Sequence, residues 1–340
     1  MKIILSSLLV CFLAISPFAQ NTDSASYYYN KAKNEIDAKH YAVASRLLDK
    51  ATKQNPTMID AFLLNGKISM EMSRVYEAGQ YFNKAYELQP SNSIVIEQLM
   101  LFNFNNGQSK KAIALAQQCS NCSQVEKVLG MSYYKSEEYG KAEKYLNTAI
   151  QKNDKDAQLV YTLGRTYLEL ENEKKAIPLF EKAIALEPER NNWMNELGLI
   201  YYNQSDYKNA VKYFNMALKS GLIQNNDFLE NLAFAQLYTG DADNAMKNLN
   251  IIQEKKPNNT QLMNDIAFAM YSTKRYEGAI EYYQKLLTLN PKDASSLFMA
   301  GMTFQKMGQK EKGQKICDKA IEMDPSLAKN RQKQEMPMGL

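Results

Sequence analysis

The sequence contains very little histidine, cysteine or tryptophan. Among 340 residues there are one histidine, four cysteines and one tryptophan. The single histidine, His40, cannot supply a His-rich zinc site, and no Ser/His/Asp or Cys/His set can be assembled around it. The G-x-x-x-x-G-K phosphate loop and the dinucleotide-binding fingerprint are also missing. These absences predict a protein that is not an enzyme, with no catalytic residues, no metal and no cofactor.

An excess of charge of one sign is also missing. Lys and Arg together number 41 and Asp and Glu together 37, so that the formal net charge is +4. Nucleic-acid-binding proteins need a strong basic field to neutralise phosphates. The charge balance therefore predicts no nucleic-acid partner and indicates an ordinary solvated surface.

Only one long apolar run occurs, at residues 3–15, after Lys2. A membrane-spanning helix needs roughly 20 apolar residues, and this run is shorter and is followed by a polar segment. We therefore predict a signal peptide at residues 1–20, cleaved near Ala19 or Gln20. The mature protein is expected in the periplasm or cell envelope, or outside the cell. An uncleaved anchor and a lipid on Cys11 are the alternatives, so any membrane association is expected only through the N-terminus.

Proline is sparse, and six of the nine prolines recur at a fixed interval. Prolines 56, 90, 188, 257, 291 and 325 are separated by 34, 98, 69, 34 and 34 residues. These separations are close to multiples of 34, a period typical of solenoid repeats. If each such proline is residue 32 of a unit, nine units result. They begin at Ala25, Ile59, Ser93, Ser123, Ala157, Asn191, Asn226, Thr260 and Ala294.

Small residues occupy fixed positions in these units. Position 8 is Gly or Ala in eight of nine units, and position 20 is Ala in eight and Gly in the ninth. Small residues at fixed helical phases let two helices approach closely, while larger neighbours interdigitate around them. Turn residues such as Asn106-Gly107-Gln108 separate the two helical segments, and proline ends the second one. Each unit is therefore predicted to be a helical hairpin.

The segment VYTLGRTYLELENEKKAIPLFEKAIALEP, residues 160–188, resembles the tetratricopeptide repeat (TPR), and the resemblance extends from residue 25 to about residue 325. It implies an all-α fold, a right-handed α-α superhelix (solenoid) of about nine TPR hairpins over residues 21–325. Residues 326–340 are expected to form a short C-terminal capping helix and tail. The Ala-Gln ending of the signal and the Lys-, Asn- and Tyr-rich body resemble Bacteroidetes proteins.

The TPR resemblance implies a partner-binding concave face at positions 2, 5, 9 and 12 of each first helix. Aromatic and Met side chains interrupted by Asn suit an extended peptide, because aromatics bury a large area and Asn pairs with backbone N–H and C=O groups. Asn195, Asn231 and Asn264 are the expected readers of the peptide backbone. The expected partner-binding residues are Lys127, Met131, Tyr134, Tyr161, Arg165, Asn195, Leu199, Tyr202, Glu230, Phe234, Asn264, Phe268, Tyr271, Phe298 and Met302.

Two alternatives concern these side chains. Phe234, Phe268 and the tyrosines could instead pack against neighbouring helices. Lys127 and Arg165, on adjacent repeats, could together bind one acidic group.

A Cys-x-x-Cys pair occurs in the stretch QQCSNCSQ. Cys119 takes position 27 of the third unit, which is Ala in six other units, and Cys122 closes this shortened unit. Ser120, Asn121 and Ser123 are the expected caps of the following helix.

A redox-active motif needs its first cysteine at a helix N-terminus, whereas Cys119 lies near a C-terminus, where the helix dipole opposes a thiolate. Thiols of exported proteins tend to oxidise, so we predict a local disulfide between Cys119 and Cys122. Two unpaired thiols, or a redox or metal site, are the alternatives. Cys317 is expected to pack as a small hydrophobe.

These features predict a non-enzymatic protein–protein interaction scaffold or adaptor of the cell envelope, which binds an extended peptide or partner protein. A membrane-attached assembly factor for an envelope or secretion machine is the alternative. A thiol–disulfide activity at Cys119 and Cys122 is a third hypothesis.

Overall fold

The computed structural model describes residues 17–329, and within them it contains 18 α-helices, one 3₁₀ turn and no strand. The all-α prediction is confirmed. Residues 1–16, which hold most of the predicted signal peptide and Cys11, lie outside the described residues, as do residues 330–340 of the predicted tail. Nowhere in the described part is a helix both long and apolar enough to cross a membrane.

The helices alternate as first and second members of hairpins. In chain order they are α1 (Pro17–Asp37), α2 (Tyr41–Gln54), α3 (Ile59–Glu71), α4 (Val75–Leu88), α5 (Ser93–Asn105), α6 (Ser109–Gln118), α7 (Val125–Lys135), α8 (Tyr139–Lys152), α9 (Ala157–Glu169), α10 (Glu173–Leu186), α11 (Asn191–Asn203), α12 (Tyr207–Lys219), α13 (Asn226–Thr239), α14 (Ala242–Lys255), α15 (Thr260–Ser272), α16 (Tyr276–Leu289), α17 (Ala294–Lys306), α18 (Lys310–Met323) and η1 (Pro325–Leu327).

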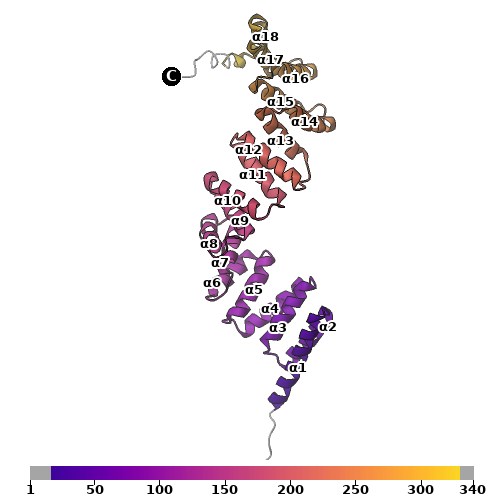
Figure 1. Cartoon of the computed structure of the whole chain (residues 1–340), viewed down its shortest axis with the longest axis vertical. Coiled ribbons are helices and arrows are strands. Elements are labelled where there is room, and N and C mark those ends of the chain that lie inside the picture. Colours follow the sequence, from indigo (N-terminus) through magenta and orange to yellow (C-terminus); the bar gives the residue numbers. More distant parts are fainter. Residues whose placement is uncertain (1–16, 330–340) are drawn as a thin grey trace, which may run out of the picture. The chain divides into compact units, whose positions relative to one another are not determined.

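Contacts divide the chain into two compact units, Met1–Ala176 and Ile177–Leu340, with the division inside α10. In the first unit α1 packs on α2, α3 on α4, α5 on α6 and α7 on α8; in the second unit α11 packs on α12, and the three following pairs do the same (Figure 1). Successive hairpins also touch, as α2 touches α3 and α12 touches α13. Each unit is thus an α-α solenoid of helical hairpins.

Seven first helices begin at the residue where the 34-residue period places the start of a unit. Two differ. α1 begins at Pro17, ahead of Ala25, and α7 begins at Val125, two residues after Ser123.

The turn between the two helices of a hairpin has the same backbone conformation in all nine repeats. Position 15 has a left-handed backbone, with φ between 54° and 94°. The N–H of the next residue bonds to the carbonyl five residues earlier at 2.7–2.9 Å, as Asp206 does to Tyr201. This hydrogen bond is the one that defines a Schellman motif at a helix C-terminus. Gly107, Gly240 and Gly308 occupy the position without strain, whereas the other six units place a residue with a Cβ there.

Positions 8 and 24 bring the two helices of a hairpin together. A Cβ at Gly198 would lie 2.6 Å from the buried ring of Phe214, and one at Gly66 would lie 2.7 Å from Phe82. These distances are below any ordinary carbon–carbon contact, so position 8 must stay small where position 24 carries a large ring.

Two other hairpins carry residues of different sizes at positions 8 and 24. In the last one, Cys317 holds position 24, and its Sγ would lie 2.6 Å from a Cβ at Gly301. Cys317 is buried and, as expected, packs as a small residue. In the third hairpin the large side chain is Met100 at position 8, and position 24 is Ala116; both are buried. In this hairpin the large residue is therefore at position 8 and the small residue at position 24.

Carboxylates join successive repeats by accepting hydrogen bonds from buried or half-buried tyrosines. Tyr81 Oη donates to Asp49 at 2.8 Å, and Tyr213 Oη donates to Glu181 at 2.9 Å. Both bonds connect position 25 of one repeat to position 23 of the next. Burial, aided by the bond to Asp49, raises the pKa of Tyr81 to about 12. The hydroxyl therefore remains a donor throughout the neutral pH range.

The left-handed turn gives a prediction about stability. Gly240→Ala should lower the free energy of unfolding by about 1 kcal/mol, because a Cβ is strained in this conformation. Ser205→Gly, at the same position of the preceding unit, should raise it by up to about 1 kcal/mol for the same reason. Urea unfolding followed by far-UV circular dichroism measures both changes.

Gly140→Ala is the control, since Gly140 lies in helix α8 and an added Cβ meets nothing within 4 Å. It should cause no loss of stability. Equal losses for Gly140→Ala and Gly240→Ala would contradict the explanation.

Candidate partner-binding face

In the second compact unit, Ile177–Leu340, the first helices of three successive hairpins form a connected row, because α11 contacts α13 and α13 contacts α15. We use the term α11–α15 face for the side of these helices that carries positions 5, 9 and 12 of each unit. Phe268 and Asn264 on α15 are exposed, Phe268 to 51 %. Asn195, Leu199, Tyr202, Glu230 and Tyr271 are half-buried, and Phe234 and Leu237 on α13 are buried.

Three of the expected partner-binding residues are not exposed. Phe234 is 7 % exposed and belongs to a buried cluster with Leu237 and Ile266. Phe298 and Met302, at 5 % and 7 %, lie in the cluster that includes the last hairpin and η1. The expectation that these side chains line an open groove is wrong, because each is buried in a cluster of neighbouring helices.

In the first compact unit, Met1–Ala176, the expected partner-binding residues lie on α7 and α9, which contact one another. Met131, Tyr134 and Tyr161 are half-buried, as are the two cations. Lys127 Nζ pairs with Asp156 Oδ2 at 2.7 Å, and Arg165 Nη2 lies 3.8 Å from Glu169 Oε1.

For Lys127 and Arg165 together to bind an external acidic group, that group would have to displace Asp156 and Glu169, and the hypothesis stays a prediction. Each cation already has a carboxylate of its own chain as partner.

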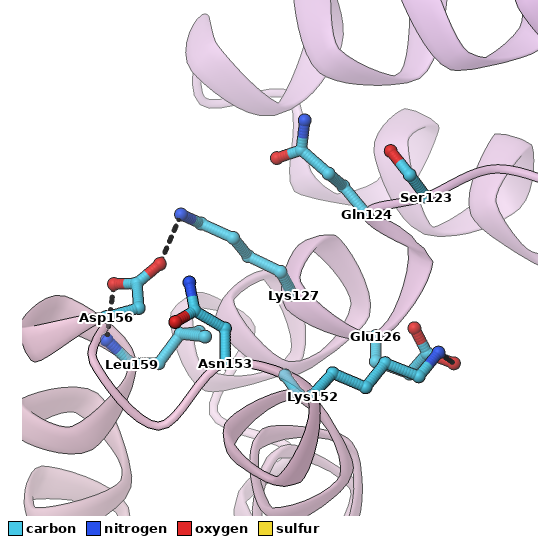
Figure 2. Close-up of a pocket in the computed structure, with 9 residues that line it drawn as sticks. Ser123, Gln124, Glu126, Lys127, Lys152, Asn153, Asp156 and Leu159 are labelled. Carbon is cyan, nitrogen blue, oxygen red and sulfur yellow. Dashed lines mark hydrogen bonds and ion pairs between the residues drawn. The ribbon is translucent and has the colours of Figure 1, made fainter.

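A cavity of about 310 Å³ lies beside Lys127, between the start of α7 and the loop that joins α8 to α9. Figure 2 shows Lys127 reaching to Asp156, while Lys152 turns the other way, to Glu126. The Lys152–Glu126 distance is 2.6 Å, and this hydrogen bond lowers the pKa of Glu126. Asp156 also caps α9, because its Oδ1 accepts from Leu159 N–H at 3.2 Å. These paired charges stabilise a joint between repeats.

Tyr202 of the α11–α15 face belongs to a row of three tyrosine rings. The rings of Tyr202 and Tyr207 meet edge to face at 5.5 Å, and those of Tyr207 and Tyr238 stack at 4.4 Å. These residues come from α11, α12 and α13. Burial raises the pKa of Tyr202 to about 12, with further contributions from the other two tyrosines and from Glu230 and Asp265.

Carboxylates accompany this row. Burial raises the pKa of Glu230, and the charges of Asp265 and Asp227 raise it further. The side chain of Asp265 also accepts hydrogen bonds from Gln261 Nε2 at 2.9 and 3.1 Å. The sequence prediction included Glu230 but missed the two aspartates.

Sequence reasoning also missed Tyr207 and Tyr238, because only positions 2, 5, 9 and 12 of first helices were considered. Tyr207 begins a second helix, and Tyr238 and Asp265 are at positions 13 and 6. Such neighbouring positions share a helix side with the chosen ones, so the helical period could have indicated them.

Cys119 and Cys122 form a disulfide with Cα atoms 5.7 Å apart. Cys119 is the C-cap of α6 and is 7 % exposed. The expected capping of the next helix is wrong: the N-cap of α7 is Gln124, which makes no side-chain cap. Ser123 instead donates its N–H and its Oγ to Glu97 Oε1, at 2.8 and 2.7 Å. The start of the fourth unit is thus tied to α5 of the shortened third unit.

Over residues 17–329, no group of three or more His, Cys, Asp or Glu side chains is placed to hold a metal ion. His40 is exposed at the first hairpin turn, where its Nδ1 lies 2.9 Å from Glu35 Oε2. Its surroundings are those of a surface residue.

Comparison with protein families identifies the class of protein. Three sequence models of the tetratricopeptide repeat match the chain, one over residues 128–184 and again over 161–221, the others over 261–293 and 294–327. The chain therefore contains tetratricopeptide repeats. Proteins built from such repeats are in general protein–protein interaction scaffolds, and this class of function is supported here. Comparison with curated proteins gives no match.

Several solved structures are similar. YrrB, described as a TPR protein with an unusual peptide-binding site, is 22 % identical over 55 % of this chain and 97 % of its own, with a TM-score of 0.40. The C-terminal part of a TPR repeat-containing protein from Cytophaga hutchinsonii is 19 % identical over 70 % and 98 %, with a TM-score of 0.46. PilF from Pseudomonas aeruginosa is 15 % identical over 72 % and 96 %, with a TM-score of 0.32.

The exposures of Phe234 and Phe268 give a prediction. Phe234→Glu should lower the free energy of unfolding by about 3 kcal/mol or more, because it buries an unpaired carboxylate and loses a packed ring. Phe268→Glu should change it by no more than about 1 kcal/mol, since half of that side chain is already in water. Urea unfolding of both variants is the measurement. Similar losses for the two would contradict the burial described above.

The disulfide gives a second prediction. Cys122→Ser should lower the free energy of unfolding by about 2 kcal/mol, the order expected for closing so short a loop. Alkylation of the unfolded chain without reduction should leave Cys119 and Cys122 unlabelled, and prior reduction should make both reactive. Labelling of either cysteine before reduction would refute the bond.

Proposed function

We propose that the chain is an exported, non-enzymatic scaffold of the cell envelope that binds an extended segment of a partner protein on the α11–α15 face. The observation that carries this proposal is the exposure of Phe268, a large aromatic side chain on a first helix, one turn after the exposed Asn264. A large aromatic ring with a carboxamide one turn away on a first helix offers a partner both contact area and hydrogen-bonding groups.

Hydrogen-bonding capacity on the same face supports an extended peptide as ligand. In the described part of the chain, the side chains of Asn264 and Asn195 make no hydrogen bond, and both are at position 5 of their units. A carboxamide offers a donor and an acceptor, which match the C=O and N–H groups of an extended backbone. Phe268 would then cover an apolar side chain of that segment.

Two observations support the proposed compartment. The apolar run at residues 3–15 has the length and flanks of an export signal. The Cys119–Cys122 disulfide suits an oxidising compartment outside the cytosol.

The test is photocrosslinking and pull-down with the purified mature chain in a native envelope fraction. Phe268→Glu should reduce the captured partner about tenfold or more, because it replaces a central aromatic contact by a charge. Ile223→Glu is the matched control: Ile223 is 91 % exposed and lies in the loop between α12 and α13, not on α11, α13 or α15. This variant should capture the partner as the unaltered chain does.

Far-UV circular dichroism must show that both variants keep their helices. Unchanged capture by the folded Phe268→Glu variant would remove the binding site from the α11–α15 face.

A further inference from the structure

A cleft of about 500 Å³ lies in the first compact unit, between α4 and the hairpin of α5 and α6; we call it the α4–α6 cleft. Its floor consists of three buried residues, Gly79 of α4 and Phe102 and Asn103 of α5. A Cβ at Gly79 would lie only 3.1 Å from the ring of Phe102, so this ring packs directly on the backbone of α4. The rim is exposed and is formed by Val75, Tyr76, Gln80, Asn83, Gln108 and Lys111.

In the next three repeats the corresponding joint holds a tyrosine of the chain itself. Position 11 of the first helix is Tyr133, Tyr167 and Tyr201 in the fourth, fifth and sixth repeats. Tyr167 Oη donates to Glu143 at 2.8 Å, and Tyr133 Oη accepts from Gln117 Nε2 at 3.1 Å. Both partners belong to the second helix of the preceding repeat. A phenol ring and its hydroxyl thus connect these repeats.

The third repeat has no tyrosine at this joint. Position 11 is Asn103, and position 23, which is Tyr81 in the second repeat, is Leu115. On the facing helix α4, positions 21 and 25 are Gly79 and Asn83. Asn103, Gly79 and Asn83 are all smaller than tyrosine, and all three line the cleft. The α4–α6 cleft therefore lies where the next three joints hold a phenol ring.

The carboxamide of Asn103 leaves a hydrogen-bond acceptor at the cleft. This residue is 5 % exposed, and its Nδ2 donates to the Leu99 carbonyl at 2.8 Å. Because a carbonyl can bond only to the nitrogen end of a carboxamide, this bond fixes the orientation of the group. Among residues 17–329 no donor bonds to Asn103 Oδ1. A buried acceptor without a partner is unfavourable, so it favours a ligand that brings a hydroxyl or N–H group into the cleft.

The charge at the rim restricts the ligand further. Lys111 is exposed and forms no ion pair within the described part of the chain, and no Asp or Glu of residues 17–329 lines the cleft. A cation without a carboxylate favours an acidic segment over a basic one. Tyr76, which is 79 % exposed at the same rim, offers contact area to the rest of that segment.

We infer that the α4–α6 cleft is a second binding site, and that it takes a tyrosine side chain of a partner protein with an acidic residue beside it. The tyrosine ring lies against Phe102, its hydroxyl donates to Asn103 Oδ1, and the acidic neighbour pairs with Lys111. This site goes beyond the proposed function, because it belongs to the first compact unit and the α11–α15 face to the second.

The experiment uses the full mature chain and an array of synthetic peptides. Each peptide has a central Tyr, Phe or Ala among random residues, and its flanks contain either Asp and Glu or Lys and Arg. The strongest binders are labelled, and fluorescence anisotropy measures their affinity. A Tyr peptide with acidic flanks should bind about tenfold more tightly than its Ala counterpart and about fivefold more tightly than its Phe counterpart.

Asn103→Leu tests the acceptor, because leucine has nearly the size of asparagine and cannot accept a hydrogen bond. It should lower the affinity for the Tyr peptide about fivefold and leave that for the Phe peptide unchanged, so that the two bind equally. Asn105→Leu is the matched control, since Asn105 is exposed at the end of α5 and does not line the cleft. This control should keep the preference for Tyr.

Asn103→Tyr tests the volume, because it gives the third repeat the side chain that the next three repeats carry at position 11. It should fill the cleft and abolish the binding of Tyr and Phe peptides alike. Asn105→Tyr is its control, because position 13 is already tyrosine in the seventh repeat, at Tyr238. Far-UV circular dichroism must show that the helices are kept, and the Asn103→Leu result decides by itself if Asn103→Tyr does not fold.

The outcomes separate this inference from the proposed function. Equal affinities of the unaltered chain for Tyr and Phe peptides, a Tyr preference that survives Asn103→Leu, tighter binding with basic flanks, or no binding at all would each overturn the inference. Phe268→Glu, in the other compact unit, should leave the affinity for the Tyr peptide unchanged. Loss of that affinity would place the peptide on the α11–α15 face and overturn the assignment to the cleft.

Discussion

The close approach of two helices at positions 8 and 24 of each hairpin is the contact on which the rest of the structure depends. Gly198 admits the ring of Phe214, and Gly66 admits that of Phe82, at distances that no Cβ would allow. Because helices pack through complementary volumes, each such pair fixes the spacing of its hairpin. The exchange of large and small between Met100 and Ala116 follows the same constraint, since both are buried and only one is large.

Because the two helices of each hairpin are held at a fixed spacing, one side of each first helix is not needed for packing within the hairpin. The identical left-handed turns close every first helix at the same point, so equivalent positions recur along each unit. Carboxylate–tyrosine bonds such as Glu181–Tyr213 then connect neighbouring repeats. On this rigid support the α11–α15 face can hold side chains that contribute little to packing, among them Phe268 and Asn264. The proposed function rests on such residues, because function depends on particular side chains and is not implied by the fold.

The helices and their pairing could be predicted because the determinants are local and repeated nine times. The site could be predicted only in part. Phe234 and Phe268 have the same position in consecutive repeats, yet one is 7 % and the other 51 % exposed. Phe234 is covered by a cluster that includes residues of the following repeat, and a repeat position carries no information about its neighbours' volume. The pairing of Lys127 with Asp156 likewise joins residues 29 positions apart.

The sequence by itself determined the period, the hairpin and the places where helices must be close, because these follow from residue size and turn chemistry within about 34 residues. It also placed Cys119 and Cys122 at an irregular joint. Only the tertiary structure decided which aromatic side chains remain in water, which cations already have partners, and which tyrosines from three helices stack on one another. Those properties depend on the packing of side chains from different repeats, whose volumes and charges vary while the backbone pattern does not.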